Sequence, residues 1–144
     1  MTNPVLLGLA AGAAGTAAMT ISTTAEMRLR GRPPSQAPAD SIERLTGWAP
    51  DSTAGRERLG TVAHAAFGTV LGLVRGAIGA LGLREPAASA VFLPVAWAPD
   101  LAVVPALGAA DPPWRWGAAE LTLSAWHHVV YVAAAGVAHE ALKD

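Results

Sequence analysis

The chain of 144 residues contains no cysteine and one tyrosine, and only 15% of its residues are charged. Without cysteine there is no disulfide framework, no thiolate metal site and no thiol redox chemistry. The net charge of −1 at pH 7 excludes an overall basic footprint for nucleic acid. The few charges are also segregated, because the segment from Thr2 to Ala25 has none and six of the nine arginines lie between Arg28 and Arg58.

Hydrophobic residues make up 52% of the chain and are concentrated in long runs. A bilayer core about 30 Å thick is crossed by an α-helix of about 20 mostly apolar residues. The runs at 4–27, 59–83, 86–107 and 117–140 are of this length. The sequence therefore predicts an all-α polytopic membrane protein, with residues 1–144 forming one domain that is a four-transmembrane-helix bundle. A soluble alanine-rich bundle is the alternative. The first run could also be a cleaved signal peptide, but it lacks the basic region that precedes one.

The third run is interrupted by Pro94, Pro99 and Pro105. Each proline removes a backbone donor, so we expect a proline-broken helix. Asp100 is the only carboxylate in the middle of this run. It is expected either to cap a restarted half-helix or to line a polar cavity.

The segment 28–58 is the main hydrophilic part of the chain. Its prolines predict an extended start, followed by a short interfacial helix over 41–47. Asp40 would cap this helix and Glu43 would close a capping box. An ordinary polar loop is the alternative. Because positive charge marks the cytoplasmic side, the arginines of 28–58 predict a cytoplasmic loop and place both termini outside.

Glycines recur at four-residue intervals in the first two runs. Small residues at this spacing let helix backbones approach closely in lipid. We therefore predict helix packing, and a groove along the second helix, at Gly8, Gly12, Gly68, Gly72 and Gly76. Arg75 lies in the same run, where a central arginine costs at least about 2.5 kcal/mol. It should therefore either extend toward the headgroups, which is the simpler expectation, or find a partner.

Polar groups follow one stripe of the last run, which has no charged residue from Leu121 to His139. A stripe of this kind must face protein or water when the helix lies in hydrocarbon. With the orientation above, residues of all four runs reach a similar depth, where they could relay protons, bind a cation or satisfy each other. This predicted binding cluster comprises Glu26, His64, Asp100, Glu120, His127 and Tyr131.

The spacings match no established metal-ligand or phosphate-binding motif, so we predict no metal site and no cofactor. A bis-histidine haem site is disfavoured because His64 and His127 differ in expected depth by about 9 Å.

The segments GLAAGAAGTAAMT, TVAHAAFGTVLGLVRGAIG and AAELTLSAWHHVVYVAAAG together resemble the YagU-type family of bacterial inner-membrane proteins. The resemblance implies a helical protein of the bacterial inner (plasma) membrane, from a family without an established biochemical activity. The prolines of the third run and the long arginine-containing loop depart from the family pattern. No catalytic residue is carried across.

Three function classes remain. The first is a non-enzymatic membrane protein that binds a small apolar ligand or lipid, or packs with a second copy or a partner subunit, between the second and fourth helices. The second is a small transporter or proton-linked channel that uses Asp100, Glu120 and His127. The third is an enzyme on a lipid-soluble substrate, with His127 as base and Tyr131 or Glu120 as its partner. The lipid bilayer is the expected partner in every case, and nucleic acid in none.

Overall fold

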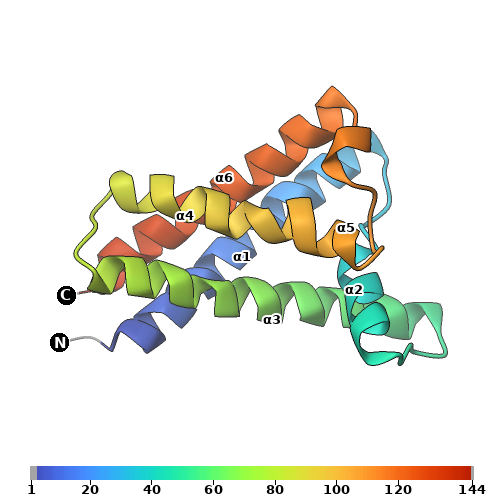
Figure 1. Ribbon diagram of the computed structural model, residues 1–144, viewed down its shortest axis with the longest axis horizontal. Coiled ribbons are helices and arrows are strands. Elements are labelled where there is room, and N and C mark those ends of the chain that lie inside the picture. The colour runs from blue at the N-terminus through green and yellow to red at the C-terminus, as the bar shows by residue number, and fades with distance from the viewer. Residues whose placement is uncertain (1–2, 144) are drawn as a thin grey trace.

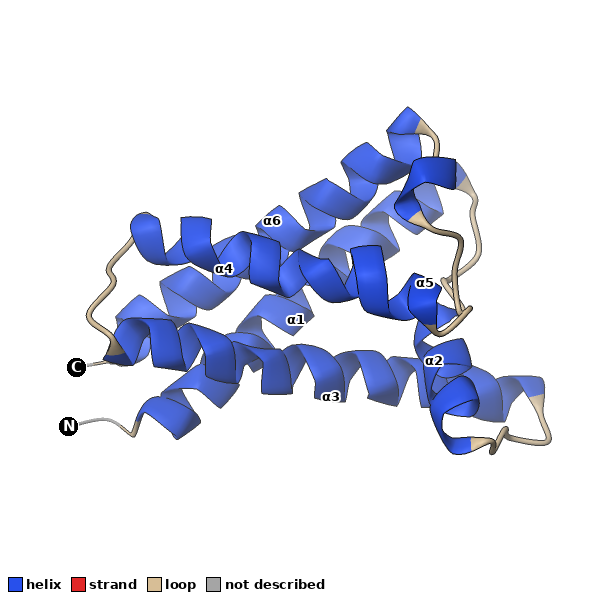
Figure 2. Ribbon diagram, viewed as in Figure 1, coloured by secondary structure: helices blue, strands red, loops and turns tan. Residues whose placement is uncertain are grey.

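The computed structural model describes residues 3–143, and every regular element in this range is helical (Figure 2). Four helical segments are long and apolar enough to cross a membrane, namely Pro4–Arg30, Thr53–Ala80, Ala87–Ala106 and Ala118–Leu142. This confirms the predicted all-α architecture with four candidate spans. The elements in chain order are α1 (Pro4–Arg30), α2 (Ala37–Thr46), α3 (Thr53–Ala80), α4 (Ala87–Ala98), the π-helix η1 (Pro99–Val103), α5 (Val104–Ala106), the 3₁₀-helix η2 (Pro113–Arg115) and α6 (Ala118–Leu142).

Helix α1 lies between α3 and α6 and makes the most extensive contacts of the fold with both (Figure 1). Helix α4 packs on α6 and, less extensively, on α3. The start of α1, the α3–α4 connection and the end of α6 lie at one end of the molecule, and α2 and α5 lie toward the other (Figure 1). The second and fourth spans therefore contact each other little, because α1 separates them.

Local signals explain where the long helices begin and end. Pro4 occupies the first turn of α1, and the side chain of Asn3 accepts a hydrogen bond from the Val5 N–H at 2.9 Å. Gly31 ends α1 in the left-handed conformation at φ 64°, which a glycine adopts without steric cost. Ser52 caps α3 by accepting from the Gly55 N–H at 3.1 Å. Helix α3 is Thr53–Ala80 rather than the predicted 59–83 because this cap precedes the apolar run.

The short helix α2 is Ala37–Thr46, so it begins before the predicted 41–47. Gln36 takes the N-cap position, and the prediction that Asp40 caps this helix is wrong. Asp40 and Glu43 instead bind Arg56 in the first turns of α3, with 2.8 Å between Glu43 Oε1 and Arg56 Nε. The proline segment was expected to delay the helix, but a proline is tolerated in a first turn. Arg56 therefore ties α2 to α3.

The third span contains the irregularity that its prolines predict. Its regular α-helical hydrogen bonding is interrupted by a π-helical segment, but the chain stays helical throughout Ala87–Ala106. Pro94 lies inside α4, and the chain then passes through the π-helix η1. Such a π segment adjusts the hydrogen-bond ladder where a proline has removed a donor. Asp100 lies within η1, so it does not cap a restarted half-helix.

The glycines of the first two spans lie at the contact between α1 and α3. A Cβ atom added to Gly12 would lie 2.8 Å from Gly72 Cα, and one added to Gly76 would lie 3.0 Å from Gly8 Cα. One added to Gly68 would lie 3.3 Å from Thr16 Cβ. The two backbones therefore touch along this line. The groove expected along the second helix is filled by α1.

The core is centred on two aromatic rings where α4 and α6 meet. Phe92 is fully buried and its ring centroid lies 5.8 Å from that of Tyr131. The Tyr131 hydroxyl donates a hydrogen bond of 2.7 Å to the Gly68 carbonyl oxygen on α3. Tyr131 is thus a buried core residue with a satisfied hydroxyl, rather than a member of the predicted polar cluster. The alanines buried around this pair are Ala11, Ala88, Ala96 and Ala135.

Candidate binding site between α1 and α6

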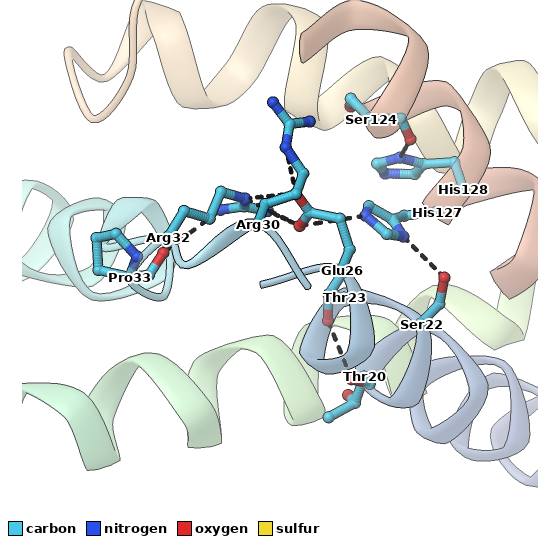
Figure 3. Close-up of polar contacts among 10 residues, drawn as sticks. All are labelled: Thr20, Ser22, Thr23, Glu26, Arg30, Arg32, Pro33, Ser124, His127 and His128. Atoms are coloured by element: carbon cyan, nitrogen blue, oxygen red, sulfur yellow. Dashed lines mark hydrogen bonds and ion pairs between the residues drawn. The ribbon is translucent and has the colours of Figure 1, made fainter. Parts of the chain in front are cut away.

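His127 on α6 faces α1 at the centre of a polar cluster (Figure 3). Its imidazole Nδ1 lies 2.9 Å from Ser22 Oγ, and its Nε2 lies 4.0 Å from Glu26 Oε2. Ser22 and Glu26 are one helical turn apart, so both side chains leave the same face of α1. His127 is only 5% exposed. The two predicted site residues Glu26 and His127 are therefore brought together at the α1–α6 interface.

Arg32 holds the carboxylate of Glu26 in place. Its Nε lies 2.9 Å from both carboxylate oxygens and its Nη2 lies 2.5 Å from Oε2. Arg30 adds a longer ion pair of 3.6 Å. The hydrogen bond with Glu26 raises the pKa of the Arg32 guanidinium above its ordinary value, although partial burial opposes this shift. The left-handed Gly31 turns the chain at the end of α1, which lets Arg32 reach back.

A groove of about 330 Å³ opens beside this cluster. It combines an apolar wall, which contains an exposed tryptophan, with a polar floor. Its lining residues are Ser22, Ala25, Glu26, Leu29, Arg30, Leu123, Trp126 and His127. The groove therefore places a buried imidazole and a carboxylate beside a surface suited to hydrocarbon.

The Nε2 atom of His127 is buried and has no hydrogen-bond partner within residues 3–143. Because this atom faces a carboxylate, the tautomer with its proton on Nε2 is electrostatically favoured. Ser22 then donates its hydroxyl proton to Nδ1, and Nε2–H is left as a donor that is buried beside Glu26 rather than exposed in the groove. A buried donor without an acceptor costs about 1–3 kcal/mol. Buried nitrogens of His64, Arg75 and His139 likewise lack a partner among the described residues, so the unpaired Nε2 does not by itself indicate a ligand.

Asp100 belongs to a second cluster, which connects the π-helix η1 with α6. Asp100 Oδ2 accepts from the Ser124 hydroxyl at 2.9 Å, and Ser124 Oγ accepts from the Trp97 indole N–H at 3.0 Å. His128 Nδ1 lies 2.8 Å from the Ser124 carbonyl oxygen. His64 on α3 interacts electrostatically with Asp100 and His128. This cluster joins the third and fourth spans through hydrogen bonds among its own members.

Glu120 lies in the first turn of α6, is exposed, and interacts electrostatically with Arg32. Neither Glu120 nor Asp100 lines the groove beside His127. The prediction that His127, Asp100 and Glu120 belong to one binding cluster is therefore wrong. Helical spacing placed Ser124, His127 and Tyr131 on one stripe of α6, but these three side chains face different neighbours, namely η1, α1 and α3.

Arg75 forms a third polar cluster toward the opposite end of the bundle. It is fully buried, and its Nη2 lies 2.8 Å from Glu85 Oε1 and 3.6 Å from Glu140 Oε1. The simpler expectation, that Arg75 extends toward the headgroups, is wrong, and the expectation of a partner is confirmed. Burial raises the pKa of Glu85, but hydrogen bonds from Ser89 and Arg75 outweigh it, so the net pKa is lowered.

A larger groove of about 740 Å³ lies between α4 and α6, with Glu85, Ser89 and Glu140 among its polar lining residues. Both carboxylates already have cationic partners, because Glu85 binds Arg75 and Glu140 binds Lys143. The remaining lining is apolar, which is the surface that any lipid chain covers in a bilayer. This groove provides space without a specific polar contact.

The side chains around the groove do not form a metal-ligand set. Within the described residues, no group of three or more histidine, aspartate or glutamate side chains is placed to hold a metal ion.

Ser22 and His127 do form a hydroxyl–imidazole pair of the kind that activates a nucleophile. However, Ser22 lies in the middle of α1, where the backbone N–H groups are used by the helix and leave no donors for an oxyanion.

Sequence reasoning missed the residues that complete these clusters, above all Ser22, Arg32 and Glu85. The one-turn spacing of Ser22 and Glu26 was a usable signal, because both polar residues interrupt the same small-residue face of α1. No local signal pairs Arg75 with Glu85 across the α3–α4 turn.

Comparisons with protein-family models, with curated proteins and with solved structures gave no match. The YagU-type resemblance therefore stays a prediction.

Proposed function

We propose that this chain is a non-enzymatic membrane protein that binds an amphiphilic small molecule or a lipid in the groove between α1 and α6. The observation that carries the proposal is the groove itself, which places the buried imidazole of His127 and the carboxylate of Glu26 beside an apolar wall. Ligand sites typically combine an apolar lining with a few well-placed polar groups. The apolar wall would hold a hydrocarbon body and the polar floor would orient its head.

The size of the groove fits a head and the first carbons of a chain rather than a whole lipid. Its volume of about 330 Å³ is at the lower end of the range of about 300–1,000 Å³ for ligand sites. Trp126 on its wall is 57% exposed, which places an aromatic surface beside the bilayer. The rest of the ligand would therefore extend along α6 into the hydrocarbon.

We also propose that the protein lies in the bacterial inner membrane with both termini outside. The arginines between Arg28 and Arg58 support this orientation, since they lie around α2, toward the opposite end from the start of α1 (Figure 1). In this orientation the His127 groove opens in the cytoplasmic half of the bilayer.

A proton-linked channel is less well supported by the same observations. The His127 and Asp100 clusters are separated from the Arg75 cluster by the buried core around Phe92 and Tyr131. Tyr131 gives its only hydroxyl proton to a backbone carbonyl of α3. A proton path needs a chain of titratable or hydrated groups, and this layer of the bundle is apolar.

Analysis of the molecules that co-purify with the protein tests the proposal. We would purify the wild type, His127→Leu and His128→Leu in the same detergent, extract each sample, and quantify small molecules by mass spectrometry. We expect one class of amphiphile to be enriched with the wild type and to fall at least about tenfold with His127→Leu, a loss of about 1.4 kcal/mol in binding. No enrichment over an unrelated membrane protein would refute the proposal.

His128→Leu is the matched control, because His128 is the next residue on α6, is also buried, and does not line the groove. It should keep the ligand. Melting temperatures distinguish binding from folding. Ser22 would lose its imidazole partner in His127→Leu, but a hydroxyl in α1 can turn to a carbonyl of its own helix, as Thr16 and Thr20 do. We therefore expect His127→Leu to remain folded. Equal ligand loss in both variants would show that the ligand does not depend on this groove.

A further inference from the structure

We infer that the α1–α6 groove holds an anionic phospholipid, with the lipid phosphate on the guanidinium of Arg30 and an acyl chain against Trp126. This inference rests on the proposed binding function and names the class of ligand. Among the described residues that line the groove, Arg30 is the one arginine or lysine. Its side chain is 49% exposed, so a phosphate can reach it from the bilayer.

The charge of Glu26 is held by Arg32, which leaves the end of the Arg30 side chain available. Arg32 Nε lies 2.9 Å from both carboxylate oxygens, whereas only the Nε atom of Arg30 approaches Glu26, at 3.6 Å. The two terminal nitrogens of Arg30 point away from this carboxylate (Figure 3). Neither has an ion pair or hydrogen bond within the part of the chain that the structure describes. These nitrogens form the planar fork that binds two phosphate oxygens at once.

The groove keeps a net positive charge after its own carboxylate is counted. Glu26 is balanced by Arg32, and Arg30 adds one further positive charge. Glu120 is exposed and acts on Arg32, but it does not line the groove. A negatively charged head at Arg30 is therefore favoured by the groove's own charge.

The polar and apolar parts of the groove lie at the depths that a phospholipid requires. Arg30 is the last residue of α1, so in the proposed orientation it lies at the cytoplasmic surface, where anionic headgroups are found. Ser22, which contacts His127, lies eight residues earlier in α1, about 12 Å deeper in the bilayer. Trp126 is next to His127 and therefore lines the wall at the level of the acyl chains.

The same features disfavour other ligands. A free phosphate would leave the apolar wall uncovered, and an uncharged lipid would leave the fork of Arg30 without an acceptor. A zwitterionic phospholipid carries an ammonium group close to its phosphate, and the guanidinium groups of Arg30 and Arg32 would repel that group. An anionic phospholipid satisfies both the charge and the wall.

Two brominated lipids test this inference: a phosphatidylglycerol and a phosphatidylcholine with the same acyl chains, brominated at the same carbon near the head. Bromine quenches a nearby indole, so Trp126 is the reporter, and Trp126→Phe identifies its share of the signal. Each lipid is titrated at low mole fraction into detergent micelles that hold the full chain. We expect saturable quenching, with the phosphatidylglycerol bound about tenfold more tightly than the phosphatidylcholine.

Arg28→Gln is the matched control for Arg30→Gln. Both substitutions remove one positive charge from the end of α1, and both side chains are exposed, so both variants should fold. Arg28 does not line the groove and lies on the opposite side of α1, because two residues turn a helix by about 200°. Arg30→Gln should abolish the preference for phosphatidylglycerol, and Arg28→Gln should retain it.

The outcomes separate this inference from the proposed function. Equal loss of the preference in the two variants would indicate a general attraction of the arginines for anionic surfaces, and would overturn the inference. Full displacement of the lipid by millimolar inorganic phosphate would overturn it in favour of a free anion. Equal, saturable quenching by the two lipids would overturn it while the proposed function stands. If quenching of Trp126 rises only in proportion to lipid content, the groove holds no ligand and the proposed function fails as well.

Discussion

Substitution of Gly72 by alanine tests whether backbone contact between α1 and α3 stabilises this bundle. A Cβ atom at position 72 would lie 2.5 Å from both the N and the Cα atoms of Gly12. These are backbone atoms of a helix, so they cannot turn aside as the end of a side chain would. The two helices must move apart, and overpacking of this kind typically costs about 1–3 kcal/mol. Loss of close contact along the neighbouring glycines places the expected value at the upper end of that range.

Gly60→Ala is the matched control, because Gly60 lies on the same helix and a Cβ atom there would lie an ordinary 3.6 Å from Ala39 Cβ. Both substitutions gain the same helix propensity, about 1 kcal/mol, so the difference between them isolates the steric cost. We would measure unfolding free energies in detergent micelles by circular dichroism with increasing denaturant. Gly72→Ala should be less stable than Gly60→Ala by about 1–3 kcal/mol. Equal stabilities would refute the view that the α1–α3 backbone contact holds these helices together.

Three further predictions concern orientation, the Arg75 cluster and the core. Because the chain has no cysteine, a single cysteine introduced at position 50 in the α2–α3 loop, or at the C-terminus, can be labelled selectively. We expect the label at position 50 to be cytoplasmic and the label at the C-terminus to be external. The reverse pair of locations would overturn the orientation. The lowered pKa of Glu85 contributes stability above its unfolded value near 4.5, and this stability is lost as the pH falls through the lower folded pKa. The unfolding free energy of Glu85→Gln should therefore depend less steeply on pH in that acidic window than that of the wild type, and an equal dependence would show that the Arg75 ion pair contributes nothing. Tyr131→Phe should cost about 0.5–1.5 kcal/mol by thermal unfolding, since the Gly68 carbonyl loses its second donor, and an unchanged melting temperature would show that this bond contributes nothing.

The candidate site was only partly predictable from the sequence. Glu26 and His127 were singled out as polar groups in apolar runs, and the structure brings them within 4.0 Å. Ser22, the hydrogen-bonding partner of His127, lies 105 residues from it in the chain, so no local pattern links the two. Asp100 was expected in the same cluster, but it accepts a hydrogen bond from Ser124 at a different interface. Depth along a helix follows from counting residues, whereas the direction of a side chain around the axis depends on which helix is its neighbour.

Arg75 shows the same limit. Its position in an apolar run predicts a cost, and the sequence offers two ways to meet that cost, by reaching the headgroups or by pairing. The choice depended on the α3–α4 turn, which brings Glu85 within 2.8 Å, and on α6, which brings Glu140 to 3.6 Å. Tyr131 was assigned to a polar cluster because its hydroxyl is polar, but most of its surface is an aromatic ring, and the ring is buried against Phe92.

The sequence by itself determined the number of long helices, their approximate bounds and the interruption of the third, because these depend on local properties: apolar length, capping groups and missing proline donors. Only the tertiary structure decided that α1 lies between α3 and α6, that α1 fills the groove expected along the second helix, and that an open groove lies beside His127. Those features depend on the order and rotation of helices that are distant in the chain, and many arrangements bury nearly equal apolar surface. The pairing of buried polar groups such as Glu26 with Arg32 and Arg75 with Glu85 distinguishes one arrangement from the others.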